Sequence, residues 1–304
     1  MAIPNGYNTV PHFRYFEDIA ASVGSTGDTY YVDVNAGVDT NDGLSWEAAF
    51  KTLAVAFAAS NASIAAGASG LANRNKIFFK GDNNEAHKET LITLPNKCDV
   101  IGVGSYDYKP YPVLIGNHVI GAGTYMGTRF VNVGFESLAA GGAMFTVPTT
   151  TSGLEFIGCF FDGSSATKAT YGINAVAVER LKIVNCEFVG AISVAAINIG
   201  AGESNGLVIK GNHILGAVNG IVIASTMTTS IRGAIVAENF ISVTTLGIND
   251  AADKAMIVDN RIISAGGTGW AACAHFDITR SSNNIVTTSD GTCYRVPPVV
   301  TTLA

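Results

Sequence analysis

The chain has 304 residues, of which 48% are apolar and only 14% are charged, a composition that excludes an intrinsically disordered protein. Eighteen Lys and Arg residues stand against 24 Asp and Glu residues, and the net charge of -6 gives no electrostatic drive toward nucleic acid or an anionic membrane. No apolar stretch is long enough to span a bilayer, so we expect neither nucleic acid nor membrane among the partners.

Residues 1–27 show no strong periodicity and are predicted to form an N-terminal arm. The first twenty residues lack the basic start and the apolar run of a secretory signal, so we expect no signal peptide. The arm is interpreted either as a docking segment or as an ordinary chain end lying against the fold.

Residues 28–62 are predicted to form a cap made of a strand, a loop rich in Asn, Asp and Gly, and a short helix. Thr52 is the expected N-cap of this helix, and Leu53, Ala56 and Phe57 share one face. An amphipathic helix in this place can cover an open end of a stacked β-structure, whose backbone groups would otherwise be unpaired.

Residues 63–289 contain a repeat. The last strongly apolar residue of each repeat recurs at intervals of 26, 27, 26, 27, 21 and 23 residues. Too few residues separate the strands for crossover helices, so successive turns must stack directly on one another. The sequence therefore predicts an all-β protein, a right-handed parallel β-helix with a short N-terminal capping helix, followed by a C-terminal tail at 290–304. These anchor residues are Phe135, Phe161, Phe188, Ile214, Ile241, Ile262 and Ile285.

Side chains at equal repeat positions should lie above one another, because adjacent rungs are about 4.8 Å apart. Two positions before the anchor, we expect an internal ladder of asparagine amides that bond along the stack. Cys159 and Cys186 extend this column as reduced thiols, and a disulfide between them is the alternative. The predicted ladder consists of Asn212, Asn239, Asn260 and Asn283.

Five positions before the anchor, apolar residues are predicted to fill the core, as period-two alternation requires. The position directly before the anchor should face outward. The predicted core column is Phe130, Phe156, Ile183, Ile209, Val236 and Ile257, and the predicted outward column is Gly134, Phe160, Glu187, His213, Phe240, Arg261 and Asn284.

The loop after the first strand carries a D-x-N-x-G-x-D-x-N-D-G pattern from Asp33 to Gly43, followed by Trp46 and by a helix start at Phe50–Leu53. On these residues the chain resembles the pectin-lyase-like right-handed parallel β-helix family, which includes phage tailspike and virion β-helix proteins. The resemblance covers about residues 28–289 and implies the fold. It leaves the activity open, because the family includes polysaccharide lyases, glycoside hydrolases and non-catalytic virion or surface proteins.

Two acidic residues are predicted to lie one rung apart, three positions before the anchor. Glu238 and Asp259 could act as a retaining glycosidase pair, for which the carboxyl groups should be about 5 to 5.5 Å apart. They could equally supply oxygen ligands to Ca²⁺, the one cofactor that we consider, or be ordinary solvated turn residues. The lyase signature of clustered acids beside a basic residue is not visible, and the Asp33–Asp42 loop is better explained by turn-forming side chains than by calcium binding.

The outward column holds the remaining candidate binding residues. Glu187 beside His213 is interpreted as a surface ion pair or, alternatively, as an acid/base pair. Phe240 beside Arg261, with Phe160 on the same face, could bind a sugar by stacking and cation-π contact, or could dock a protein.

These observations lead to three functional hypotheses. The first is a non-enzymatic structural virion protein of a phage, such as a capsid decoration, fibre or tailspike-like component, made in the host cytoplasm and contacting other virion proteins or copies of itself. The second is a polysaccharide lyase or glycoside hydrolase, such as a depolymerising tailspike that acts on a host surface glycan. The third is a carbohydrate-binding surface protein.

Overall fold

The computed structural model describes residues 27–66, 73–81, 87–104, 111–138, 140–163, 168–224, 227–228, 233–252, 255–267, 274–276 and 278–296. Except for Gly27, the predicted N-terminal arm lies outside these residues, as does the tail from residue 297 onward. No helix in the described part of the chain is long and apolar enough to cross a membrane.

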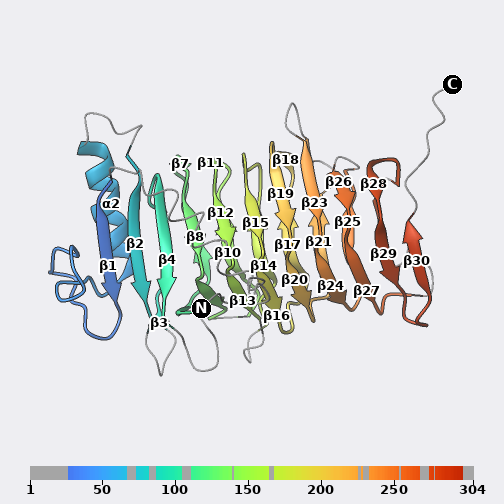
Figure 1. The fold of residues 1–304 in the computed structure, drawn as a ribbon, viewed down its shortest axis with the longest axis horizontal. Helices are drawn as coiled ribbons and strands as arrows, with labels where there is room; N and C mark the ends of the chain where they lie inside the picture. Colours follow the sequence, from blue (N-terminus) through green and yellow to red (C-terminus); the bar gives the residue numbers. More distant parts are fainter. Residues whose placement is uncertain are drawn as a thin grey trace, which may run out of the picture.

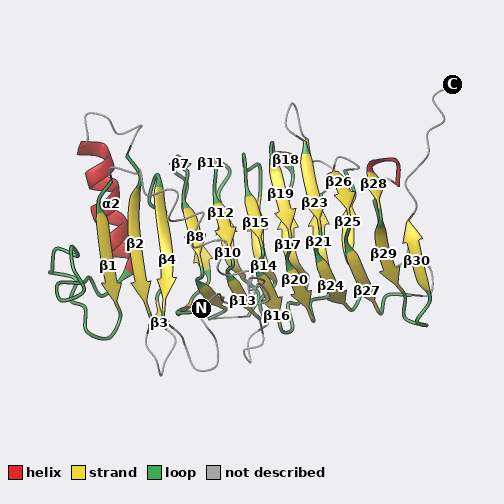
Figure 2. Cartoon of the chain, viewed as in Figure 1, coloured by secondary structure: helices red, strands yellow, loops and turns green. Residues whose placement is uncertain are grey.

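Three parallel sheets, A, B and C, make up the molecule and run along its long axis (Figures 1 and 2). Each turn of the chain contributes one strand to sheet A, then one to sheet B and, over most of the length, one to sheet C. This arrangement confirms the predicted parallel β-helix. Sheet A contains β1 (Thr29–Asp33), β2 (Asn75–Lys80), β4 (Cys98–Val103), β8 (Arg129–Val131), β12 (Glu155–Ile157), β15 (Lys182–Val184), β19 (Leu207–Lys210), β23 (Ala234–Ala237), β26 (Ala255–Val258) and β28 (Ser281–Ser282).

Sheet B is equally long and ends in the one antiparallel pairing recorded among the described strands. Sheet C starts later in the chain. Sheet B contains β3 (His87–Lys88), β5 (Val113–Ile115), β9 (Gly134–Glu136), β13 (Phe160–Asp162), β16 (Glu187–Val189), β20 (His213–Leu215), β24 (Phe240–Val243), β27 (Arg261–Ser264), β29 (Asn284–Thr287) and β30 (Cys293–Val296); sheet C contains β6 (His118–Val119), β10 (Ala143–Val147), β14 (Tyr171–Ala175), β17 (Ala195–Ile199), β21 (Asn219–Ile223) and β25 (Ile248–Asp250); two short pairs join β7 (Tyr125–Met126) to β11 (Thr151–Ser152) and β18 (Gly202–Glu203) to β22 (Met227–Thr228), and a 3₁₀ turn, η2, spans Ile278–Arg280.

The core consists of the columns that the repeat predicted. Phe156 pairs in register with Phe130 on one side and with Ile183 on the other, and all three are fully buried. In sheet B, Phe161 pairs with both Phe135 and Phe188. Because equal repeat positions pair in register, residues of one kind stack continuously from rung to rung.

The predicted capping helix is present, and it continues to Ala66, four residues beyond the predicted end of the cap at residue 62. The helix α2 (Leu53–Ala66) lies beside β1 and β2 at one end of the stack (Figure 1). Leu53, Ala56 and Phe57 are buried, and the ring of Phe57 approaches that of Phe130 at 6.5 Å between centroids. The helix therefore covers the core where sheet C has not yet begun.

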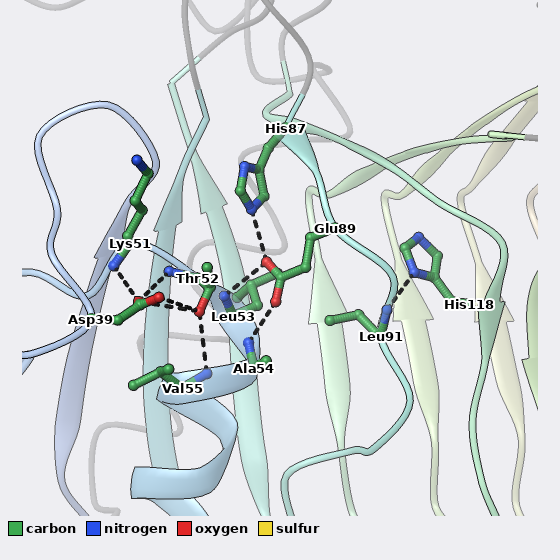
Figure 3. A network of polar contacts seen from close by, with 10 residues as sticks. All are labelled: Asp39, Lys51, Thr52, Leu53, Ala54, Val55, His87, Glu89, Leu91 and His118. Atoms are coloured by element: carbon green, nitrogen blue, oxygen red, sulfur yellow. Dashed lines mark hydrogen bonds and ion pairs between the residues drawn. The ribbon is translucent and has the colours of Figure 1, made fainter.

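Acidic side chains hold the first turn of α2 (Figure 3). Thr52 lies at the N-cap, with its Oγ1 3.5 Å from the amide nitrogen of Val55. Asp39 accepts hydrogen bonds from the backbone N–H and the hydroxyl of Thr52, and Glu89 accepts from the N–H groups of Leu53 and Ala54. These carboxylates satisfy N–H groups that have no partner within a helix.

The last rung differs by one residue from the prediction. Ile262 pairs with Val286, not with Ile285, and Val286 is fully buried whereas Ile285 is 41% exposed. Both residues are apolar, so the choice of the last apolar residue in this rung was ambiguous. The anchor is therefore Val286, and Ile285 takes the outward position predicted for Asn284.

Residues 293–296, which the sequence placed in the tail, form β30 and pair antiparallel with β29. This strand runs in the opposite direction to the other strands of sheet B and forms the end of the sheet. The β-structure thus extends a few residues beyond the predicted boundary at residue 289.

Candidate functional site

From β8 onward, a left-handed corner separates sheet A from sheet B in each rung. The residue three positions before the anchor has a positive φ, between 51° and 66°, in seven successive rungs. Gly and Asn tolerate this conformation best, which explains why they dominate the column. The corner residues are Asn132, Gly158, Asn185, Gly211, Glu238, Asp259 and Asn283.

The residue after each corner points inward and forms the predicted ladder. The amide oxygen of Asn239 accepts hydrogen bonds from the backbone nitrogen and the Nδ2 of Asn212, both at 2.9 Å. Asn239 in turn donates to the oxygen of Asn260 at 2.8 Å and to the carbonyl of Ile209 at 3.1 Å. The side chains are buried, so the ladder satisfies polar groups that water cannot reach.

The final member of the ladder is Asn284, not Asn283 as predicted. Asn284 Oδ1 accepts from both nitrogens of Asn260, at 2.9 and 3.0 Å, and its Nδ2 donates to the carbonyl of Ile257. Asn283 instead occupies the exposed corner, with φ of 55°. This correction is the same one-residue shift that makes Val286 the anchor.

Two thiols continue the ladder toward the N-terminus, as expected. Cys159 and Cys186 are buried and free, so the alternative of a disulfide is wrong. Cys159 Sγ lies 3.4 Å from the carbonyl oxygen of Phe130, and Cys186 Sγ lies 3.4 Å from that of Phe156. Burial raises the pKa of Cys186 well above its usual value, so this thiol is protonated and unreactive.

Glu238 and Asp259 occupy corners of adjacent rungs, as predicted. Each is bonded to a different neighbour. Glu238 Oε1 lies 3.0 Å from Lys210 Nζ, with both side chains about half exposed, while Asp259 accepts a hydrogen bond from Asn283. A backbone corner thus explains the position of these acids, and their catalytic or Ca²⁺-binding chemistry stays a prediction.

The described part of the chain contains no group of three or more His, Cys, Asp or Glu residues that could hold a metal ion. In the N-terminal loop, Asp33 accepts two backbone N–H groups and the Lys80 ammonium at 2.7 Å, and Asp42 accepts the N–H of Leu44. These carboxylates act as turn-forming side chains.

The outward column of sheet B is continuous and constitutes the candidate binding site. Its residues pair in register from rung to rung. We call its accessible part the sheet B strip, and with four intervals of about 4.8 Å it is about 19 Å long. The strip consists of Glu187, His213, Phe240, Arg261 and Ile285, each of them exposed or half-buried.

The middle of the strip is a cluster of stacked polar and aromatic groups. The ring of His213 meets that of Phe240 edge-on at 4.9 Å, and Arg261 Cζ lies 5.6 Å from the centroid of Phe240. Arg261 and Phe240 thus lie in a cation-π contact with each other, and their role in binding a sugar or a protein stays a prediction. His213 Nδ1 is 4.0 Å from Glu187 Oε1, which fits a loose surface ion pair, and the acid/base alternative stays a prediction.

Phe160 does not belong to the exposed surface. Tyr111 stacks on it with 5.8 Å between the ring centroids, and Phe160 is only 8% exposed. Burial, with a contribution from the charge of Glu187, raises the pKa of Tyr111 to about 12, so the phenol stays neutral. Because Tyr111 lies outside the repeat pattern, its contact with Phe160 could not be predicted from the sequence.

Comparisons with known proteins add little to this geometry. No family model and no curated protein sequence matches the chain. A solved rhamnogalacturonan lyase can be superimposed with a TM-score of 0.36 and 10% identity, covering 85% of this chain and 87% of that one. The assignment of the fold therefore depends on the strand pairing described above.

Proposed function

We propose that this protein is a non-enzymatic structural component of a phage particle, in which the β-helix serves as a rigid spacer and binding surface. The observation that carries the proposal is the unbroken stack, with ten strands following one another in each of sheets A and B. Nine intervals of about 4.8 Å give a rod about 43 Å long. The Asp33–Leu53 segment, which resembles the opening of β-helix proteins that include phage tailspikes, supports the same proposal.

The polar groups of the described rungs favour structure over catalysis. Glu238 and Asp259 occupy left-handed corners at which each contacts a neighbouring side chain, and Glu187 and His213 form a loose surface pair. The sheet B strip then offers a docking surface for other virion proteins or for further copies of this chain.

The proposal is tested by locating the protein in particles released from the cells that produce it. We expect cryo-electron microscopy with antibody labelling to find it in regular copies on the particle, and quantitative gel analysis to give a fixed copy number. If the protein occurs only free in the lysate, while a capsid control co-purifies with the particles, the proposal is wrong.

A glycan-binding or glycan-cleaving function is the second candidate, favoured by the His213, Phe240 and Arg261 cluster. On a glycan array, Phe240→Ala should abolish retention of any bound glycan, because the stacking face is lost. Retention without release of new chain ends would indicate a carbohydrate-binding protein. Release that disappears in Glu238→Gln or Asp259→Asn would indicate a hydrolase or lyase and would contradict the structural proposal.

A further inference from the structure

An open groove of about 400 Å³ lies along the turns that lead into sheet A, on the N-terminal half of the molecule. Its volume falls in the range of small-molecule sites, roughly 300 to 1,000 Å³. We call it the basic groove. It is lined by Arg74, Gly127, Arg129, Gly153, Glu155, Arg180, Lys182 and Gly206.

The groove is positively charged although the whole chain carries a net charge of -6. Beneath it, the fully buried Asp99 accepts hydrogen bonds from Arg74 Nε at 2.7 Å and from Arg129 Nε and Nη2 at 2.6 Å. Burial alone would raise the pKa of Asp99, but the hydrogen bonds from Arg129 and Arg74 outweigh it and lower the pKa, so Asp99 is ionised.

Glu155 is the second carboxylate of the groove. It pairs in register with Arg129 and Lys182 on the adjacent strands, and its Oε1 lies 2.8 Å from Lys182 Nζ. The four cations that line the groove thus exceed Asp99 and Glu155 by two positive charges. An anion with two negative charges would neutralise this excess.

Arg180 is the feature that points to a ligand. It has a φ of 54°, at a turn position where the neighbouring rungs carry Gly153 and Gly206 with φ of 69° and 68°. A non-glycine residue pays a steric cost in this conformation. The side chain of Arg180 is exposed and makes no hydrogen bond or ion pair with any described residue, so its guanidinium group is available to a ligand in the groove.

Arg74 differs from Arg180 because Asp99 already engages it. Arg74 Nη2 is buried and lies 2.5 Å from Asp99 Oδ1, and Arg74 Nε donates a hydrogen bond to the same oxygen. Arg74 therefore adds positive charge to the groove, and Arg180 is the lining cation that has no partner among the described residues.

We propose that the basic groove binds a divalent oxyanion, a phosphate or sulfate group, with Arg180 as the principal ligand and with the positive charges of Arg74, Arg129 and Lys182 adding to the attraction. The planar fork of a guanidinium group matches the oxygens of such an anion and can bind them in pairs. Gly127 and Gly153 carry no side chains, so the anion can approach the floor of the groove. The group could be a free ion or an ester on a sugar, and the proposal is independent of any role in a particle.

Calorimetric titration tests this proposal with inorganic phosphate and sulfate, at a low and constant ionic strength set by sodium chloride. We expect saturable binding that chloride does not reproduce and that Arg180→Gln weakens at least tenfold, because a charge-assisted hydrogen bond is lost. Arg261→Gln, which removes an exposed arginine from sheet B, should bind as the unaltered protein does. Absence of binding, or equal loss in both variants, would overturn the proposal.

Glucose 6-phosphate and glucose distinguish the two sources of the anion. If the sugar phosphate binds more tightly than inorganic phosphate while glucose does not bind, the ligand is an ester whose sugar occupies the rest of the groove. Equal affinity for both phosphates identifies the free ion. Binding of glucose alone at the same site would contradict the assignment to an anion.

Arg180→Gly separates ligand binding from a structural role. Glycine adopts the left-handed conformation of this turn without steric cost. The variant should therefore unfold at a higher temperature and yet lose phosphate affinity at least tenfold. If Arg180→Gly is less stable than the unaltered protein and binds phosphate equally well, the role of Arg180 is structural and the proposal fails.

Discussion

The N-terminal and C-terminal halves of the β-helix build the same core and ladder columns from different side chains. From β8 to β16, five of the six residues in the core columns of sheets A and B are phenylalanine, Ile183 being the sixth, and thiols occupy two ladder positions; from β19 to β27, isoleucine and valine fill these columns and amides occupy the ladder. In both halves the ladder residue donates to the carbonyl of a core residue in the preceding rung, as Cys186 does to Phe156 and Asn239 to Ile209.

This difference in side chains shows that each half needs a directional interaction between neighbouring rungs. Stacked rings supply it in the N-terminal half, where Phe161 and Phe188 are nearly parallel at 4.6 Å, and each such pair contributes about 0.5 to 1.5 kcal/mol beyond its buried area. Aliphatic side chains offer no such directional contact. In the C-terminal half the amides supply the direction, because each oxygen accepts two hydrogen bonds from the rung before it.

The largest expected effect lies in the N-terminal half and depends on pH. His118 is fully buried, packs against Phe135 and Phe145, and accepts a hydrogen bond from the N–H of Leu91 (Figure 3). Burial lowers its pKa to about 3. Because an unfolded histidine has a pKa of about 6.5, the unfolded state takes up the proton first, so stability is complete above about pH 6.5 and falls toward pH 3, by about 5 kcal/mol in total.

Urea unfolding at several pH values measures this loss. In His118→Gln the decrease between pH 6.5 and pH 4 should be much smaller, since glutamine does not titrate there. His213→Gln removes an exposed histidine and should leave the pH dependence unchanged. If His118→Gln retains the full dependence, other groups are responsible and the acid sensitivity is not a property of this position.

The next effect compares the two ladder materials directly. Asn239→Ala removes the acceptor of two buried N–H groups and one donor to Ile209, and should cost about 3 to 4 kcal/mol. Cys186→Ala removes one weak thiol bond and should cost about 1 kcal/mol. Equal losses in urea unfolding would show that the amides are not what connects the C-terminal rungs.

The smallest effect concerns the corners themselves. Glu238→Gly should stabilise the protein by about 0.5 to 1 kcal/mol, because relief of the left-handed strain exceeds the loss of an exposed ion pair and of chain entropy. Gly158→Ala is the converse change. An added Cβ would meet no atom within 4 Å there, so only the strain at φ of 59° should lower the midpoint of thermal unfolding. A stabilised Gly158→Ala variant would contradict this account of the corner.

The columns were predictable from the sequence because parallel rungs in register place equal repeat positions side by side. That logic identified the core, the Asn212–Asn260 part of the ladder and the sheet B strip. It failed by one residue in the last rung, where Asn283 and Asn284 are adjacent and only the left-handed corner decides which of them turns inward. Phe160 was misplaced because its cover, Tyr111, comes from a segment without the repeat.

The basic groove was missed for a different reason. Its cations come from three kinds of position: Arg74 directly precedes β2, Arg129 and Lys182 share an outward column, and Arg180 lies in the turn before β15. The alternation of Arg129, Glu155 and Lys182 at intervals of 26 and 27 residues was visible in the sequence. The buried Asp99, which orients two of the arginines, becomes recognisable only when the rungs are stacked.

Because the register of the stack is uniform, the length of the molecule is proportional to its number of turns. Each rung contacts its immediate neighbours, so inserting one more turn of about 26 residues between β16 and β19 would lengthen the rod by about 4.8 Å and leave the helix-covered start and the β30 end unchanged. The length of this protein thus changes in steps of one turn, and the duplication or loss of a single repeat lengthens or shortens the rod by one step.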